Sequence, residues 1–289
     1  MRSFLPAFDL HRPSSLDEAL SLLAAEPGAW RPFAGGTDLM VLLEAGKLEH
    51  RRLLSLWGLS ELRGISVDPT TVTLGALTTY TDVRRDAVLQ AEFPLLCRAA
   101  SETGGIATQN RGTIGGNLAN ASPAADTPPA LLVYDAELEL LSVRGSRVIP
   151  YGAFHLGYKV MDLAPDEIIG RVRLPRGRDR WAELYRKVGT RRAQAISKVC
   201  VAAAARVDRG VVSDIRIALG SVAPTVIRAA AAENVLRGQR LTGAAVRHAA
   251  EQVVAAIAPI DDLRSTSRYR AAVVRNVVTE FLRSLPGAS

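Results

Sequence analysis

Two glycine pairs, each followed by small polar residues, carry the residue types in this chain best suited to binding a ligand. Gly35-Gly36 precede Thr37-Asp38, and Gly115-Gly116 precede Asn117. Glycine lacks the Cβ that would keep a phosphate away from backbone N–H groups, and the neighbouring hydroxyl and amide side chains can donate further hydrogen bonds. Together the two pairs predict one site, in which two loops hold a phosphate-bearing dinucleotide from opposite sides.

The segment that contains the second pair predicts a long irregular loop. From Thr103 to Ala125 the sequence shows no apolar periodicity, and loops of this length inside a compact domain usually carry function. Asp126 follows the loop, and because a carboxylate repels phosphate we expect it on ribose hydroxyls or adenine amino groups. The alternative is that both pairs are tight turns, with Asp38 and Asp126 as helix caps.

Several common motifs are missing from the sequence. It contains no GxGxxG after a strand, no GxxxxGK(S/T) and no GxSxG, which argues against a Rossmann fold, a P-loop and an α/β-hydrolase. Cys97 and Cys200 are far apart and the four histidines are scattered, so no metal-ligand spacing occurs. We therefore expect no zinc site and no iron–sulfur cluster bound by this chain itself.

The composition is that of an ordinary globular protein with a basic excess. The chain has 289 residues, 48% of them hydrophobic, and a net charge of +7. A phosphate-bearing cofactor or an acidic partner protein explains this excess. Aromatic residues make up only 5% of the chain, so we expect no nucleic-acid partner. The absence of a long apolar run predicts no signal peptide, no membrane span and a cytoplasmic location.

Apolar periodicity and turn residues predict three parts, at residues 1–57, 58–177 and 178–289. In the first two parts they predict helices at 14–25, 39–44 and 94–102, one helix that begins at Thr79 and one that follows Asp126. They predict strands at 30–33, 53–56, 64–77, 137–140, 148–149 and 168–174. In the third part they predict strands at 181–187, 198–207 and 211–219, then helices at 224–237, 242–257 and 267–285. Strands followed by helices are typical of an α+β domain.

Both glycine-rich stretches resemble those of a known family. The runs Ala34-Gly35-Gly36-Thr37-Asp38-Leu39 and Thr113 to Asp126 resemble the two flavin loops of the molybdenum hydroxylase flavoprotein subunit, found in aerobic carbon monoxide dehydrogenases and xanthine dehydrogenases. The resemblance covers essentially the whole chain, including the run from Asp214 to Pro224. It implies an α+β protein with an FAD-binding fold of the vanillyl-alcohol-oxidase type. Two α/β subdomains would hold FAD between them, and a C-terminal α+β domain of antiparallel sheet plus helices would follow.

The resemblance also implies roles for single residues. Both loops would hold the pyrophosphate, Asp126 would lie on the adenosine side, and Ile169 would contact the flavin. Lys187 would lie near the isoalloxazine, where a cation stabilises the reduced anionic flavin. The implied cofactor-binding residues are Pro32, Phe33, Ala34, Gly35, Gly36, Thr37, Asp38, Thr113, Gly115, Gly116, Asn117, Ala119, Asn120, Asp126, Ile169 and Lys187. Neither loop contains histidine or cysteine, so we expect non-covalent FAD, with no catalytic residue and no metal ligand in this chain.

The function implied by the resemblance is electron transfer within a larger enzyme. A large molybdopterin-binding subunit would hydroxylate the substrate, and electrons would pass from the 2Fe–2S clusters of a small subunit through FAD to an external acceptor. The complex is expected to be a dimer of heterotrimers. Two alternatives stay open, a stand-alone FAD-dependent reductase or oxidase and a non-enzymatic scaffold whose glycine pairs are only turns. The substrate, the acceptor (NAD, quinone, oxygen or other) and the oligomeric state of the isolated chain are also open.

Overall fold

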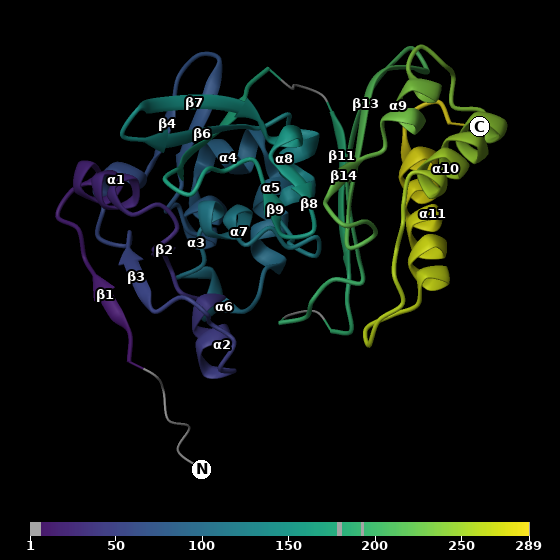
Figure 1. Cartoon of the computed structure of the whole chain (residues 1–289). Coiled ribbons are helices and arrows are strands. Elements are labelled where there is room, and N and C mark those ends of the chain that lie inside the picture. Colours follow the sequence, from purple (N-terminus) through teal and green to yellow (C-terminus); the bar gives the residue numbers. More distant parts are fainter. Residues whose placement is uncertain (1–6, 178–180, 192–193, 289) are drawn as a thin grey trace.

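Three sheets of three or more strands follow one another across the described part of the molecule, with helices between and around them (Figure 1). This computed structural model describes residues 7–177, 181–191 and 194–288. We expected no signal peptide in the N-terminal region, and the first six residues of that region lie outside these ranges. Within the described ranges every helix is too short or too polar to span a bilayer.

The N-terminal part is a small parallel sheet. The strands β1 (Asp9–His11), β3 (Arg52–Ser55) and β2 (Trp30–Phe33) lie in the order β1-β3-β2. Parallel neighbours need crossover connections, and α1 (Leu16–Ala25) and α2 (Leu39–Glu44) lie in the two connections. The strand at 30–33 and the helix at 39–44 are confirmed at their predicted bounds.

The middle part is an antiparallel sheet covered by short helices. Its strands lie in the order β4 (Ile65–Val67), β5 (Thr71–Gly75), β10 (Ile168–Pro175), β6 (Glu137–Ser142) and β7 (Gly145–Pro150). Its helices are α3 (Tyr80–Arg85), α4 (Ala87–Glu92), α5 (Pro94–Glu102), α6 (Ile106–Gln109), α7 (Ile114–Ala119) and α8 (Pro128–Val133). A hairpin of β8 (His155–Gly157) and β9 (Val160–Met161) and 3-10 turns at Ser60–Leu62 and Tyr151–Ala153 complete this part.

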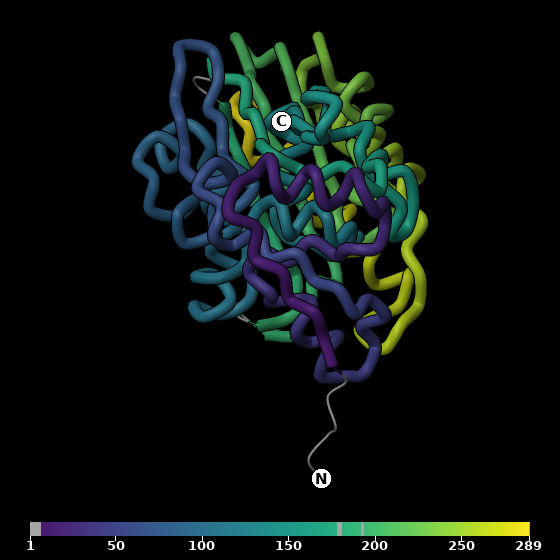
Figure 2. Tube along the Cα trace, turned by 60° about the vertical axis from the view of Figure 1, so that its left-hand side comes forward, coloured from purple at the N-terminus to yellow at the C-terminus, as the bar shows by residue number. Residues whose placement is uncertain are grey.

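The C-terminal part is an antiparallel sheet with helices on its outer face. The strands β11 (Ala182–Val188), β12 (Val199–Asp208), β13 (Val211–Gly220) and β14 (Ile227–Arg228) pair in chain order. The helices α9 (Ala230–Leu236), α10 (Gly243–Ala255) and α11 (Ser267–Ser284) cover the side of this sheet away from the middle part (Figure 1). Figure 2 is turned so that the N-terminal part comes forward, and in this view the C-terminal helices lie behind it.

The C-terminal sheet is buried on both faces, and its two faces carry different side chains. Small residues such as Ala202, Ala204 and Ala218 belong to the same core as α5 and α8 of the middle part. Branched residues such as Val201 and Ile217 pack under α9, α10 and α11. The sequence of a strand that is buried on both faces is a continuous run of apolar residues. This explains the alanine-rich stretch of β12. The small residues let α8 lie close to the sheet.

Two predictions of secondary structure are wrong. The segment 103–125 is not irregular throughout, because it contains α6 and α7. Helices of one or two turns are too short to show a 3.6-residue pattern, and burial of Ile114 and Leu118 stabilises α7 through tertiary packing. The helix predicted at 224–237 begins at Ala230, because residues 227–228 pair with β13 as strand β14.

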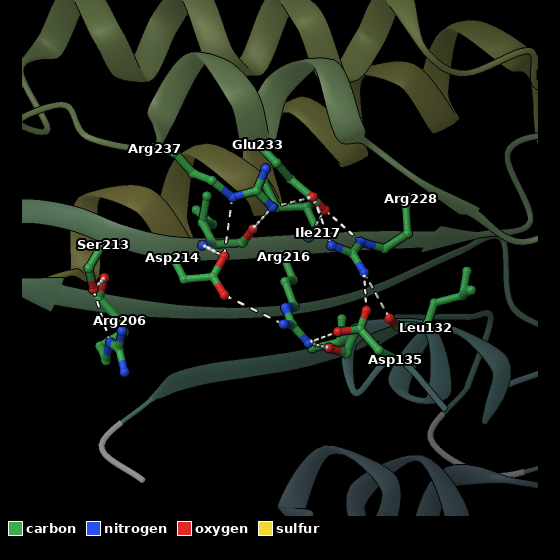
Figure 3. Close-up of polar contacts among 12 residues, drawn as sticks. Leu132, Asp135, Arg206, Ser213, Asp214, Arg216, Ile217, Arg228, Glu233 and Arg237 are labelled. Carbon is green, nitrogen blue, oxygen red and sulfur yellow. Dashed lines mark hydrogen bonds and ion pairs between the residues drawn. The ribbon is translucent and has the colours of Figure 1, made fainter. Parts of the chain in front are cut away.

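A polar network joins the C-terminal sheet to the end of α8 (Figure 3). Arg216 donates to the backbone oxygen of Val133 at 3.0 Å, and Arg228 donates to that of Leu132 at 2.9 Å. Both arginines also form ion pairs with Asp135. Cations at a helix C-terminus satisfy its last carbonyl groups and complement its dipole. These contacts therefore position the sheet that carries Lys187 relative to the middle part.

Glu233 of α9 holds this network from the other side of the sheet. Its carboxylate is almost completely buried and accepts from Ile217 N at 2.8 Å, from Arg228 Nε at 2.6 Å and from Arg237 Nη2 at 3.0 Å. Both oxygens are therefore fully bonded, which is the condition under which a buried charge is tolerated. Removal of Glu233 would leave the partly buried Arg228 without its main counter-ion.

We expect Glu233→Ala to lower the free energy of unfolding by about 3–5 kcal/mol, the usual cost of breaking a buried ion pair. The matched control is Glu251→Ala on α10, whose side chain is 69% exposed and should change stability by no more than about 0.5 kcal/mol. Urea unfolding of both variants measures the difference. Equal stability of the two variants would show that the network does not fasten the sheet.

Candidate cofactor site

A cavity of about 640 Å³ lies where the three parts of the chain meet. Its walls come from the N-terminal sheet, from the segments around α6 and α7, from residues 161–169 and from the C-terminal part. Cavities of this size in proteins usually hold a ligand or cofactor. Its lining includes the predicted residues Pro32, Ala34, Gly35, Gly36, Thr37, Asp38, Thr113, Gly115, Gly116, Asn117, Ala119, Asn120, Asp126 and Ile169. Phe33 and Lys187 are not part of the lining.

The two glycine loops touch each other directly at the cavity. A Cβ added to Gly35 would lie 1.7 Å from the backbone oxygen of Arg111, so the first loop packs on the backbone of the second. Gly36 has a φ of +77°, and a Cβ there would lie 2.7 Å from Phe33 Cζ. Phe33 therefore packs against the turn itself, and this contact explains why it is absent from the cavity wall. The prediction that two loops form one site is supported by this geometry.

The backbone N–H groups of the first loop are available to an anion. Among the described residues, those of 35–38 donate to no protein acceptor. The loop carbonyls are used instead, since Gly36 O accepts from Met40 N and Asp38 O accepts from Val41 N. Successive unpaired amides in a turn form an anion-binding concavity. Asp38 precedes α2 but makes no capping hydrogen bond with its side chain, so its interpretation as a side-chain helix cap is wrong.

The second loop differs from the first because its amides are already bonded. Ile114 N donates to Thr78 O at 3.0 Å, Gly115 N to Ala76 O at 2.9 Å and Gly116 N to Thr113 Oγ1 at 3.1 Å. A Cβ on Gly115 would lie 2.6 Å from Ala76 Cβ, so this glycine is needed for packing within the protein. The expectation that both glycine pairs expose backbone donors therefore holds for the first loop only.

The second loop offers asparagine side chains in place of amides. Asn117 Oδ1 accepts from Thr127 Oγ1 at 2.6 Å, and Asn120 Oδ1 accepts from Lys159 Nζ at 2.6 Å. Because each amide oxygen is engaged, the NH2 group of each side chain is left as a donor. Asn117 and Asn120 are thereby oriented to donate to an anionic or carbonyl group of a ligand.

Asp126 lies at the end of the cavity next to the C-terminal sheet. Its Oδ2 forms a buried ion pair with Lys187 Nζ at 2.7 Å, and Lys187 also donates to Glu102 O at 2.7 Å. Asp126 is therefore not a helix cap; the residue before α8 is Thr127, which makes no side-chain capping bond. Asp126 and Lys187 therefore lie together at this end of the cavity.

The second carboxylate oxygen of Asp126 has no partner. Oδ1 is buried and, among the described residues, accepts no hydrogen bond. Burial raises the pKa of Asp126 to about 6, although the ion pair with Lys187 opposes this shift. A buried unbonded acceptor costs free energy unless a ligand donor satisfies it. Hydroxyl or N–H donors of a cofactor would meet this requirement.

Sequence reasoning missed several lining residues. Arg31 lies on β2 directly before the predicted loop, so its adjacency to Gly35-Gly36 was an available signal. His50, Tyr80 and Arg264 come from distant segments and carry no local pattern that could have identified them. Within the described ranges, no group of three or more His, Cys, Asp or Glu side chains is placed to hold a metal ion.

Comparison of this chain with known protein families indicates which cofactor the cavity binds. The family model described as "FAD binding domain in molybdopterin dehydrogenase" matches residues 6–177, which is more than half of the chain. The chain belongs to this family. The model of the "CO dehydrogenase flavoprotein C-terminal domain" matches residues 184–285. The chain is therefore an FAD-binding subunit of the molybdenum hydroxylase type, and the recognition made from the two loops is confirmed.

Named relatives and solved structures agree with this assignment. The chain is 32% identical over 281 residues to the xanthine dehydrogenase FAD-binding subunit of Escherichia coli O157:H7, with 96% of each chain covered. It is 32% identical over 279 residues to the carbon monoxide dehydrogenase medium chain of Hydrogenophaga pseudoflava, covering 96% of this chain and 97% of that one. A solved carbon monoxide dehydrogenase structure from the latter organism superimposes with a TM-score of 0.92 at 33% identity, covering 96% of each chain. The predicted fold class is thereby confirmed.

The residues of the cavity fit FAD, the cofactor of this family. The first loop supplies unpaired amides for a pyrophosphate, the asparagines supply oriented donors, and Asp126 supplies an unsatisfied acceptor. Ile169 supplies an apolar surface in the same cavity. The roles of single residues toward FAD remain predictions.

We expect Gly116→Leu to abolish FAD retention while the chain still folds. Gly116 is exposed in the cavity, and a side chain there meets only Thr113 Oγ1, at 2.8 Å. Loss of that helix cap should cost about 1 kcal/mol. The control Gly58→Leu has nothing within 4 Å of its Cβ and should keep FAD. Flavin absorbance and circular dichroism measure both properties, and wild-type FAD content in Gly116→Leu would contradict the assignment.

Asp126 should make the stability of the apoprotein fall as the pH rises from about 4 to about 6. Its folded pKa of about 6 lies above the ordinary 3.8, so in this window the folded state holds a proton that the unfolded state has lost. The stability lost should be at most about 3 kcal/mol. Urea unfolding of the wild type and of Asp126→Asn at several pH values measures this loss. The stability of the wild type relative to that of the variant should fall as the pH rises and should level off above pH 6. A difference independent of pH would refute the linkage.

Proposed function

We propose that this chain passes electrons from the 2Fe–2S clusters of a partner subunit through FAD to an external acceptor. The observation that carries the proposal is the makeup of the cavity, which suits holding a dinucleotide rather than transforming a substrate. The cavity combines the unpaired amides of 35–38, the oriented asparagine donors and the unbonded Oδ1 of Asp126. Two of its acids, Asp126 and Glu167, are held in ion pairs with Lys187 and Arg147.

Each part of the site has a separate task in this proposal. The amides of 35–38 bind the pyrophosphate, and Thr113, Asn117 and Asn120 add side-chain donors. Asp126 Oδ1 accepts from a hydroxyl or N–H group of the cofactor, and Ile169 packs against its ring. FAD, when bound, supplies the exchange of one or two electrons. The protein contributes position, exclusion of water and the charge around the cofactor.

The partners follow from the relatives. Proteins similar to this chain carry names such as medium chain and FAD-binding subunit of carbon monoxide and xanthine dehydrogenases. We therefore propose a large molybdopterin-binding subunit and a small 2Fe–2S subunit, assembled as a dimer of heterotrimers in the cytoplasm. The three-part division at 1–57, 58–177 and 178–289 is proposed on the same basis, with the FAD cavity at the junction.

Loss of FAD should interrupt electron transfer after the clusters. In a complex assembled with Gly116→Leu, we expect substrate to reduce the 2Fe–2S clusters normally. Reduction of an external dye should slow by at least about tenfold. The control is the complex with Gly58→Leu, and absorbance of clusters, flavin and dye follows each step.

Two outcomes would overturn the proposal. The first is dye reduction at the wild-type rate in a Gly116→Leu complex that holds no FAD, which would place the electron exit outside this chain. The second is turnover of NADPH or oxygen by the isolated wild-type chain, which would favour a stand-alone reductase or oxidase.

A further inference from the structure

The β8–β9 hairpin places a lysine beside Asn120, a residue of the cavity wall. Lys159 lies in the hairpin turn with a φ of +60°, a left-handed conformation that residues other than glycine rarely adopt. Such strain persists where the surrounding structure holds it, and it is common at binding sites. Met161 of the same hairpin lines the cavity.

The hairpin is fixed to the C-terminal end of α7. His155 Nε2 donates to Leu118 O at 2.9 Å, because a carbonyl oxygen can only accept. Lys159 Nζ donates to Asn120 Oδ1 at 2.6 Å and to the backbone oxygen of Asn120. The ammonium group is therefore held beside a residue of the cavity wall rather than pointing freely into solvent.

Lys159 forms hydrogen bonds but no ion pair within the described ranges. Both of its acceptors are uncharged oxygens. An ammonium group has three N–H donors, so one remains unused. Lys187 differs in this respect, since the carboxylate of Asp126 compensates its charge.

The electrostatic surroundings of Lys159 connect it to the first glycine loop. Partial burial lowers the pKa of Lys159, the carboxylate of Asp38 raises it, and Arg31 lowers it further. Asp38 belongs to the loop whose amides are unpaired, and Arg31 precedes that loop on β2. Asn120, to which the ammonium group is bonded, lines the same cavity as this loop.

We propose that Lys159 binds the pyrophosphate of the cofactor and closes the phosphate subsite from the hairpin side. The proposal rests on FAD being held as described under Proposed function. A dianionic pyrophosphate would receive the third N–H of Lys159, and a hydrogen bond between two charged groups is about twice as strong as a neutral one. Through the same ammonium group, Lys159 would keep the Asn120 side chain oriented as a donor.

The test compares ligands with and without phosphate on the full-length apoprotein. Lys159→Gly removes the charge and suits the left-handed backbone, so the fold should be kept or slightly stabilised. We expect its dissociation constants for FAD and ADP to rise about 10- to 100-fold, whereas that for riboflavin should change less than about twofold. Lys159→Arg should recover part of the FAD affinity. Lys47→Gly, at another exposed lysine, is the matched control for lost charge.

Two results would overturn the role of Lys159, and a third concerns FAD binding itself. Wild-type affinity for FAD in Lys159→Gly would exclude a phosphate contact. Equal loss of riboflavin and FAD affinity would show a general structural effect of the hairpin. If the wild-type apoprotein binds neither FAD nor ADP, the proposed function fails first and this proposal with it. Flavin fluorescence and calorimetry give the dissociation constants.

Discussion

The close contact between Gly35 and the backbone of Arg111 is the constraint on which the cavity depends. A side chain at position 35 would overlap the Arg111 oxygen, so only glycine lets the first loop reach the second. The second loop is itself fixed by a hydrogen bond that Tyr80 N donates to Gly112 O. The guanidinium of Arg111 lies 3.8 Å from the ring centroid of Trp57. The two loops thus form one wall because backbone meets backbone, with no side chain between them.

Within that wall the two glycine pairs do different work. In the first loop, glycine produces a turn whose amides stay unpaired and can bind an anion. In the second loop, the amides of residues 114–116 bond to the protein, and Gly115 allows α7 to pack against Ala76. Similar sequences therefore produce a donor surface in one place and a packing surface in the other. Donors from the second loop come from the asparagines instead.

Charge is arranged unevenly along the cavity. At the end next to the C-terminal sheet, Asp126 and Lys187 neutralise each other, and an unsatisfied carboxylate oxygen remains for a ligand donor. Beside Asn120, the ammonium group of Lys159 bonds only to neutral oxygens and forms no ion pair within the described residues. The first arrangement suits a neutral, hydrogen-bonding part of a ligand, and the second suits an anionic part. The network of Asp135, Arg216 and Arg228 keeps the sheet that bears Lys187 at the required position.

The sequence by itself determined the cofactor class and most of the elements. The glycine pairs, the strand at 30–33, the helices at 39–44 and 94–102 and the order of strands before helices in the last part are local patterns, and the structure confirms them. Only the tertiary structure decided which amides are free, that Asp126 meets Lys187, and that Lys159 lies beside Asn120. These features depend on residues brought together from distant parts of the chain, and periodicity or spacing along the sequence does not report such contacts. The short helices α6 and α7 were missed for the same reason, since packing rather than local propensity stabilises them.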